Sequence, residues 1–156
     1  MKISKILIGI DDSKFAEYAA SYGFDIAHTF NAHVGLVHIV EPAVIADTST
    51  DPIIGSTTPN YDEMNILSIQ KDQADNIIER TIERYAKGLE VTHFNEYGST
   101  ADGILSCSKE FKADLIVIGT HSRSGIDRLL MGSVAESVVR SSQVPVLVVP
   151  LIETGE

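Results

Sequence analysis

Cysteine and tryptophan are almost missing from this chain. Among its 156 residues there is no tryptophan and one cysteine, Cys107. A single cysteine cannot form an intramolecular disulfide, so a disulfide scaffold is excluded and a reducing compartment fits the composition. No candidate base accompanies Cys107 in the sequence, so we interpret it as a small buried residue on a helix rather than a nucleophile.

Basic residues are also scarce. Twelve lysines and arginines stand against 22 aspartates and glutamates, which gives a formal net charge of −10 at pH 7. The basic residues form no run along the chain. Because an acidic surface repels phosphate backbones, we expect no nucleic-acid partner.

Long apolar runs are the third absence. No stretch reaches the roughly 18 apolar residues that a transmembrane helix needs. The apolar run at residues 6–10 is too short for the core of a signal peptide. We therefore expect a cytoplasmic protein with no membrane partner.

The chain does contain a regular succession of short apolar segments. Four of them are nearly continuous and rich in isoleucine and valine, at residues 6–10, 34–40, 115–118 and 146–149. Such segments are typical of parallel strands that are buried on both faces of a sheet. A fifth segment, at residues 91–97, indicates an edge strand because its side chains alternate along the chain. One set is Val91, His93, Asn95 and Tyr97, and the other is Thr92, Phe94 and Glu96.

Apolar residues at helical spacing lie between these strands. They predict helices over residues 13–30, 62–88, 99–112 and 132–142, the first with Ser13 as its N-cap. In the second helix, Leu67, Ala74 and Ile78 would share one apolar side, and the acidic remainder is interpreted as a solvated face.

The alternation of strands and helices predicts a doubly wound α/β fold with right-handed crossovers. The length predicts a single domain over residues 1–156. Residues 41–61 are the exception to compact connections, because they contain three prolines, a glycine and many serines and threonines. We expect a long loop there.

Ligands of open α/β sheets bind beyond the carboxyl ends of the strands. Asp11 follows the first predicted strand, Ile39 lies near the end of the second and Gly119 follows the fourth. Each has a structural alternative: Asp11 caps the first helix or braces the loop, Ile39 packs in the core and Gly119 serves a turn. The sequence contains no G-x-G-x-x-G motif, no Walker A loop and no cluster of cysteine and histidine for a metal.

Residues 119–133 lead from the end of a strand to the start of a helix. Glycines at 119, 125 and 132 allow the backbone to approach a ligand closely. Gly132 and Ser133 open the last helix, whose free N–H groups and dipole favour an anion. We predict an anion site there, with a plain helix start as the alternative, and we assign no catalytic residue and no metal ligand.

The segment GTHSRSGIDRLLMGSVAESVVRSSQVPVLVVP, at residues 119–150, closely resembles the universal stress protein family. The segments ILIGIDDS at residues 6–13 and LVHIVEP at residues 36–42 are similar to it more loosely. Members that bind ATP carry a glycine, two residues, a second glycine, nine residues and then Gly-Ser or Gly-Thr. Gly119 and the pair Gly132-Ser133 match this pattern, whereas Ser122 stands in place of the middle glycine.

The resemblance implies a function for each matching residue. Asp11 would lie near the adenine and ribose, Ile39 would pack on the adenine and Gly119 would lie beside the ribose. The residues that would hold the phosphates of ATP are Ser122, Gly132 and Ser133. A Mg²⁺ ion would be held largely by those phosphates and by water.

The resemblance also implies an architecture and an assembly. The expected sheet has five parallel strands in the order 3-2-1-4-5, with helices on both faces. Members of the family commonly form homodimers through the last strand, here residues 145–150.

Three functions stay open on the sequence. The favoured one is a stress-response regulator that binds ATP or AMP and signals through its conformation or a partner. The second is a nucleotide-free, dimeric interaction protein of the same fold, which Ser122 in place of a glycine would favour. The third is a slow ATPase, for which we expect weak hydrolysis at most because no known catalytic motif is present.

Overall fold

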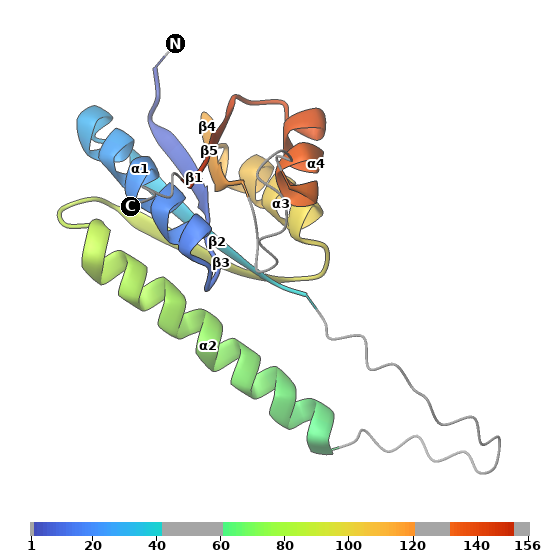
Figure 1. Ribbon diagram of the computed structural model, residues 1–156. Helices are drawn as coiled ribbons and strands as arrows, with labels where there is room; N and C mark the ends of the chain where they lie inside the picture. Colours follow the sequence, from blue (N-terminus) through green and yellow to red (C-terminus); the bar gives the residue numbers. More distant parts are fainter. Residues whose placement is uncertain (1, 42–60, 121–131, 152–156) are drawn as a thin grey trace, which may run out of the picture.

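The computed structural model describes residues 2–41, 61–120 and 132–151 (Figure 1). Within them, five strands alternate with four helices. The strands are β1 (Lys5–Gly9), β2 (His33–Val40), β3 (Val91–Tyr97), β4 (Leu115–Gly119) and β5 (Val146–Val149). The helices are α1 (Lys14–Phe30), α2 (Tyr61–Tyr85), α3 (Thr100–Phe111) and α4 (Ser133–Ser141). Residues 42–60 of the expected loop at 41–61 lie outside the described residues. The predicted site residue Ser122 also lies outside them.

The strands form one parallel sheet in the order β3-β2-β1-β4-β5, which confirms the expected α/β topology. Ile6 of β1 lies between Val34 of β2 and Leu115 of β4, so β1 is central. The alternating strand β3 lies at one edge, as predicted, and β5 lies at the other. The order of the chain reverses between β1 and β4, because β2 and β3 extend the sheet on one side and β4 and β5 on the other.

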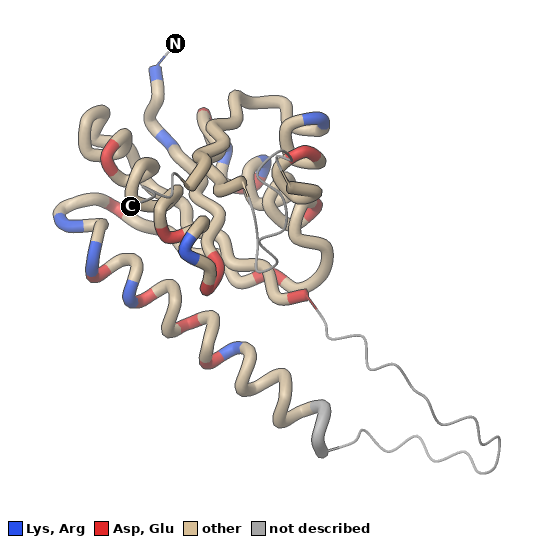
Figure 2. The backbone as a smooth tube through the Cα atoms, in the orientation of Figure 1, with Lys and Arg blue, Asp and Glu red and all other residues tan. Residues whose placement is uncertain are grey.

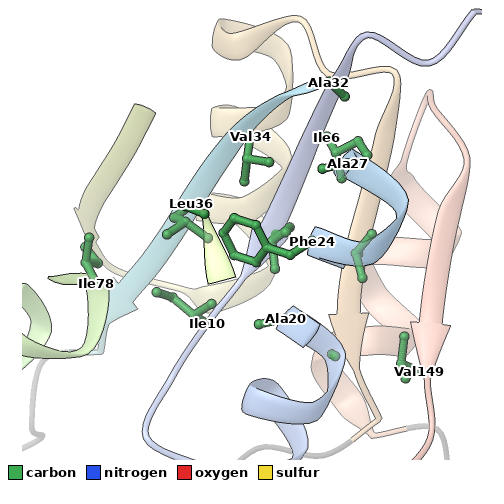
Figure 3. Close-up of a cluster of buried hydrophobic side chains, with 14 of the residues drawn as sticks. Ile6, Ile10, Ala20, Phe24, Ala27, Ala32, Val34, Leu36, Ile78 and Val149 are labelled. Carbon is green, nitrogen blue, oxygen red and sulfur yellow. The ribbon is translucent and has the colours of Figure 1, made fainter. Parts of the chain in front are cut away.

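Helices cover both faces of the sheet, and a separate apolar core lies under each pair. Ile6 and Ile8 of β1 pack in the core beneath α1 and α2, where Phe24 points at the strands among Val34 and Leu36 (Figure 3). Leu7, between them in sequence, packs in the opposite core with residues of α3 and α4. Successive side chains of a strand point to opposite faces. Burial of both faces therefore explains why β1 is continuously apolar.

The predicted cap of α1 is confirmed, because the Ser13 Oγ accepts a hydrogen bond of 3.1 Å from the Ala16 N–H. The predicted apolar side of α2 is buried only in part. Ala74 and Ile78 are buried, but Leu67 is 47% exposed. Figure 1 shows the first turns of α2 standing away from the sheet, so the apolar side of this helix is longer than the surface that it covers.

The amino ends of β1 and β4 are joined by the carboxylate of Asp114. Its Oδ2 accepts hydrogen bonds of 2.9 Å from the Ser4 N–H, the Ser4 hydroxyl and the Lys5 N–H. These donors, Ser4 first, hold the pKa of Asp114 below its ordinary value, because they stabilise the charged form. The carboxylate at the amino ends of β1 and β4 is therefore hydrogen-bonded within the chain.

No helix in residues 2–41, 61–120 or 132–151 is long and apolar enough to cross a membrane.

Candidate functional site

A cleft of about 980 Å³ lies beyond the carboxyl ends of β1, β2 and β4. It includes the point between β1 and β4 at which the strand order reverses, the usual ligand position in a doubly wound sheet. Its volume is at the upper end of the range for small-molecule sites. Residues from all four helices contribute to the wall, so elements on both faces of the sheet enclose this space.

The fold brings together five of the six predicted site residues. The cleft is lined by Asp11, Ile39, Gly119, Gly132 and Ser133. They are widely separated in sequence and meet because parallel strands end at the same edge of a sheet. The sixth residue, Ser122, lies outside the described residues.

Asp11 has a structural function that the sequence had left open. Its Oδ1 accepts a hydrogen bond of 2.7 Å from the Ser13 N–H, which braces the turn into α1. The side chain is half-buried and also lines the cleft. This hydrogen bond to Ser13 fixes the carboxylate at the cleft wall.

Gly119 is required by packing. A Cβ atom at this position would lie 2.8 Å from the Phe15 carbonyl oxygen and 3.0 Å from its carbonyl carbon. Those atoms belong to the backbone of α1 and cannot rotate away. The glycine therefore lets the first turn of α1 approach the end of β4 closely, and this approach forms part of the cleft floor.

Ile39 lies between the core and the cleft. It is half-buried and packs against the core under α3 and α4. Gly103 of α3 makes room for it, because a Cβ there would collide with the Cδ1 of Ile39. The structure thus supports the packing alternative for Ile39 and leaves part of the side chain at the cleft wall.

Gly132 precedes α4 with φ +82° and ψ 146°, a conformation that side-chain-bearing residues rarely adopt. It provides no side-chain cap for the helix. The first backbone bond runs from the Glu136 N–H to the Gly132 carbonyl, at 3.0 Å. The N–H groups of residues 133–135 thus have no acceptor within α4. This uncapped turn is suited to an anion.

The charged side chains in the described lining of the cleft are mostly acidic. It contains the carboxylates of Asp11, Asp12, Glu41 and Glu136. Glu41 accepts a hydrogen bond of 2.6 Å from Thr100, and Glu136 pairs with Arg140 at 2.7 Å. Figure 2 shows acidic residues where β1 and β2 end. A polyphosphate entering this space needs positive groups that offset the repulsion.

The sequence analysis missed the wall that α2 contributes. The side chains of this wall are polar and share one side of the helix: Gln70, Gln73, Asn76 and Arg80. Their spacing of three or four residues was visible in the sequence, but a solvated face has the same pattern. Gln73, Asn76 and Arg80 are exposed, as a solvated face requires, and they also line the cleft.

A smaller hollow of about 210 Å³ adjoins the cleft between α1 and α2. Both cavities are lined by Asp11, Asp12 and Arg80, so they are neighbours. In the hollow, Arg84 forms an ion pair with Glu17 and lies over the Tyr85 ring, 5.5 Å from its centroid.

Cys107 is 1% exposed in the core under α3 and α4. Burial, and secondarily the nearby carboxylates of Glu96 and Glu110, raise the pKa of its thiol to about 11. This confirms its interpretation as a buried residue, because a nucleophilic cysteine needs a lowered pKa. Within the part of the chain that is described, no group of three or more histidine, cysteine or acidic side chains is arranged to hold a metal ion.

The sequence model of the universal stress protein family matches residues 2–150. The chain belongs to this family. Universal stress protein MJ0531 of Methanocaldococcus jannaschii is 31% identical over 147 residues, which are 93% of this chain and 81% of the relative. Universal stress protein YxiE of Bacillus subtilis is 30% identical, over 94% of this chain and 98% of the relative.

Solved structures agree with the fold of this universal stress protein. The hypothetical protein MJ0577 superposes with a TM-score of 0.82 at 23% identity, over 99% of this chain and 100% of that one. A universal stress protein in complex with cAMP has a TM-score of 0.67 at 23% identity, over 96% and 98% of the chains. The Archaeoglobus fulgidus protein in complex with dAMP has a TM-score of 0.61 at 20% identity, over 95% and 98%.

Proposed function

We propose that this universal stress protein is a cytoplasmic regulator that binds an adenine nucleotide, ATP above all, in the cleft beyond β1 and β4. The observation that carries the proposal is the meeting of Asp11, Ile39, Gly119 and the uncapped start of α4 around one cavity. Binding would change the conformation or the partner surface, which is how a protein without a catalytic motif can signal.

Two family members of the same fold support an adenine nucleotide as the ligand. One was solved in complex with cAMP and the other in complex with dAMP. The volume of about 980 Å³ accommodates a ligand of this class. The apolar side chain of Ile39 offers a surface for the base.

The α4 end of the cleft fits the phosphates. The free N–H groups of the first turn of α4 and its positive dipole end suit a phosphate, and the Ser133 hydroxyl adds a donor. Because the described lining offers no cluster of ligands for a metal, Mg²⁺ would be held mainly through the phosphates and water.

The experiment that tests this proposal begins with the purified protein. Any bound nucleotide is released and identified, and ATP and AMP are then titrated with Mg²⁺ by calorimetry. Saturable binding with one site per chain is expected. No bound nucleotide and no heat of binding would overturn the proposal and favour the nucleotide-free interaction protein.

A charge change at the start of α4 locates the phosphates. Ser133→Asp places a carboxylate at the positive end of the helix, which favours folding but repels a phosphate. We expect at least a tenfold loss of ATP affinity, about 1.4 kcal/mol, with no loss of thermal stability. Ser137→Asp is the matched control, since Ser137 is exposed on α4 and absent from the cleft lining. Equal affinities of the two variants would contradict this position of the phosphates.

We also propose a homodimer formed through residues 145–150. β5 is an edge strand of the described sheet, and edge strands need either protection or a partner. Light scattering gives the mass in solution, and a monomer at micromolar concentration would reject the dimer.

A further inference from the structure

Two arginines one turn apart on α2 have different surroundings. Arg84 forms an ion pair with Glu17 and lies over the ring of Tyr85. Arg80 is exposed, and it forms no hydrogen bond or ion pair with any residue in the described ranges. Arg80 also differs from Arg84 in lining the cleft. Arg84 thus links α2 to α1, whereas Arg80, one turn earlier, lines the open cleft.

Arg80 is the one arginine or lysine in the described lining of the cleft. The carboxylates whose partners the structure gives are already engaged: Asp11 with the Ser13 N–H, Glu41 with Thr100 and Glu136 with Arg140. None of these bonds involves Arg80. The guanidinium therefore lies on the α2 wall of the cavity, and these three carboxylates form no ion pair with it.

We infer that Arg80 binds a phosphate of the nucleotide from the α2 wall and sets the preference of the cleft for a phosphorylated ligand. This inference rests on the proposed function. It adds a contact from the face of the sheet that α1 and α2 cover, whereas the start of α4 lies on the opposite face. The ligand's charge is thereby met from two sides.

The chemistry of the wall suits this contact. A guanidinium presents five N–H donors in a planar fork and binds phosphate oxygens in pairs, which a single backbone N–H cannot do. Asn76 and Gln73 line the same strip of α2, and their amides can donate or accept hydrogen bonds beside the phosphate. Without Arg80, the described wall would offer the ligand no arginine or lysine.

The test compares ligands that differ in phosphate number. Adenosine, AMP and ATP are titrated against the wild-type chain and Arg80→Gln by calorimetry. We expect the variant to lose about tenfold in affinity for AMP and ATP and to bind adenosine as the wild-type chain does. The loss should shrink as salt is raised, because screening weakens a contact between partly exposed charges.

Two further variants separate binding from a general effect of charge. Lys71→Gln removes the same charge from an exposed position on α2 that is absent from the cleft lining, and it should leave all three affinities unchanged. Arg80→Lys keeps the charge without the planar fork and should recover part of the affinity. The denaturation midpoint of Arg80→Gln should equal that of the wild-type chain.

The outcomes also distinguish this inference from the proposed function. If the wild-type chain binds none of the three ligands, the proposed function fails. If the wild-type chain binds AMP or ATP and Arg80→Gln binds them equally well, only the inference about Arg80 is overturned. An equal loss for adenosine would overturn it too, because a phosphate contact cannot weaken a ligand without phosphate.

Discussion

The two ends of the parallel sheet differ in the surroundings of their polar groups. At the amino ends, Asp114 accepts three hydrogen bonds from Ser4 and Lys5, and the Lys5 Nζ donates to the Phe111 carbonyl at 3.2 Å. At the carboxyl ends, the chain leaves a cleft with an uncapped helix start and the cation of Arg80. Polar groups at the first end stabilise the fold, whereas the second end combines bonded carboxylates with an uncapped helix start and an arginine that face the cleft.

The difference follows from the geometry of a parallel sheet. Each strand is followed by a helix, so helix starts collect at the carboxyl ends together with their free N–H groups. Variants at the amino end should change stability alone. Variants at the carboxyl end should change ligand affinity, with or without stability.

The largest effect is expected for Gly119→Ala. Its Cβ would meet the backbone carbonyl of Phe15 at 2.8 Å, so α1 and β4 must separate. We expect a loss of about 2–3 kcal/mol in the free energy of unfolding, measured by urea denaturation, and weaker nucleotide binding. Gly9→Ala is the control, because its Cβ would meet the side-chain Cγ2 of Ile118 at 3.1 Å, a longer contact that involves no backbone atom of a helix. Equal losses in both variants would show that the close approach of α1 has no special cost.

Asp114→Ala should have an intermediate effect. Removing the carboxylate leaves the Ser4 and Lys5 donors without their acceptor, and we expect a loss of about 1–2 kcal/mol at pH 7. Nucleotide affinity should not change, because Asp114 lies at the opposite end of the strands. A drop in affinity comparable to that of Ser133→Asp would break the separation of the two ends.

The contribution of Asp114 also depends on pH. The pKa of its carboxyl is lowered in the folded protein, chiefly by the hydrogen bonds from Ser4. The unfolded chain therefore binds the proton more tightly, so this stabilisation is complete above the ordinary aspartate pKa of about 4 and is lost as the pH falls through the lower folded value. The stability difference between the wild-type chain and Asp114→Asn should shrink over that acidic range. A difference that grows on acidification would contradict the assignment.

The smallest effect is expected for Ser13→Ala. The variant removes the oxygen that accepts the Ala16 N–H, and N-cap losses of this kind cost about 1 kcal/mol. Ser13→Asp supplies another capping oxygen and should restore most of the stability in the same urea titration. If Ser13→Asp were as unstable as Ser13→Ala, the cap would not be the cause.

Much of the fold could be predicted because its signals are local. The continuous apolar runs of β1, β2, β4 and β5 require burial on both faces, and the alternation in β3 indicates an edge. The ends of the strands likewise predicted Asp11 and Gly119 as residues of one site, since parallel strands end together. The strand order itself came from the family resemblance, because apolar periodicity does not specify which strands are adjacent.

Two features of α2 could not be predicted: how far the helix extends past the sheet, and that one of its sides lines the cleft. Leu67 continues the apolar side that buries Ala74 and Ile78, yet it is 47% exposed because the helix extends past the sheet. The exposure of a helix residue depends on whether another element lies opposite it. Periodicity carries no information about that distant element.

The sequence by itself determined the elements, the apolar side of each and the residues that end each strand, because apolar spacing and capping act over a few residues. Only the tertiary structure decided that Gly119 is needed for the approach of α1, that Arg84 is occupied by Glu17 and that Arg80 faces the cleft. Those facts depend on how α1, α2 and the sheet are oriented in space. Two arginines of one helix are equivalent in the sequence and become different only when the helix is packed.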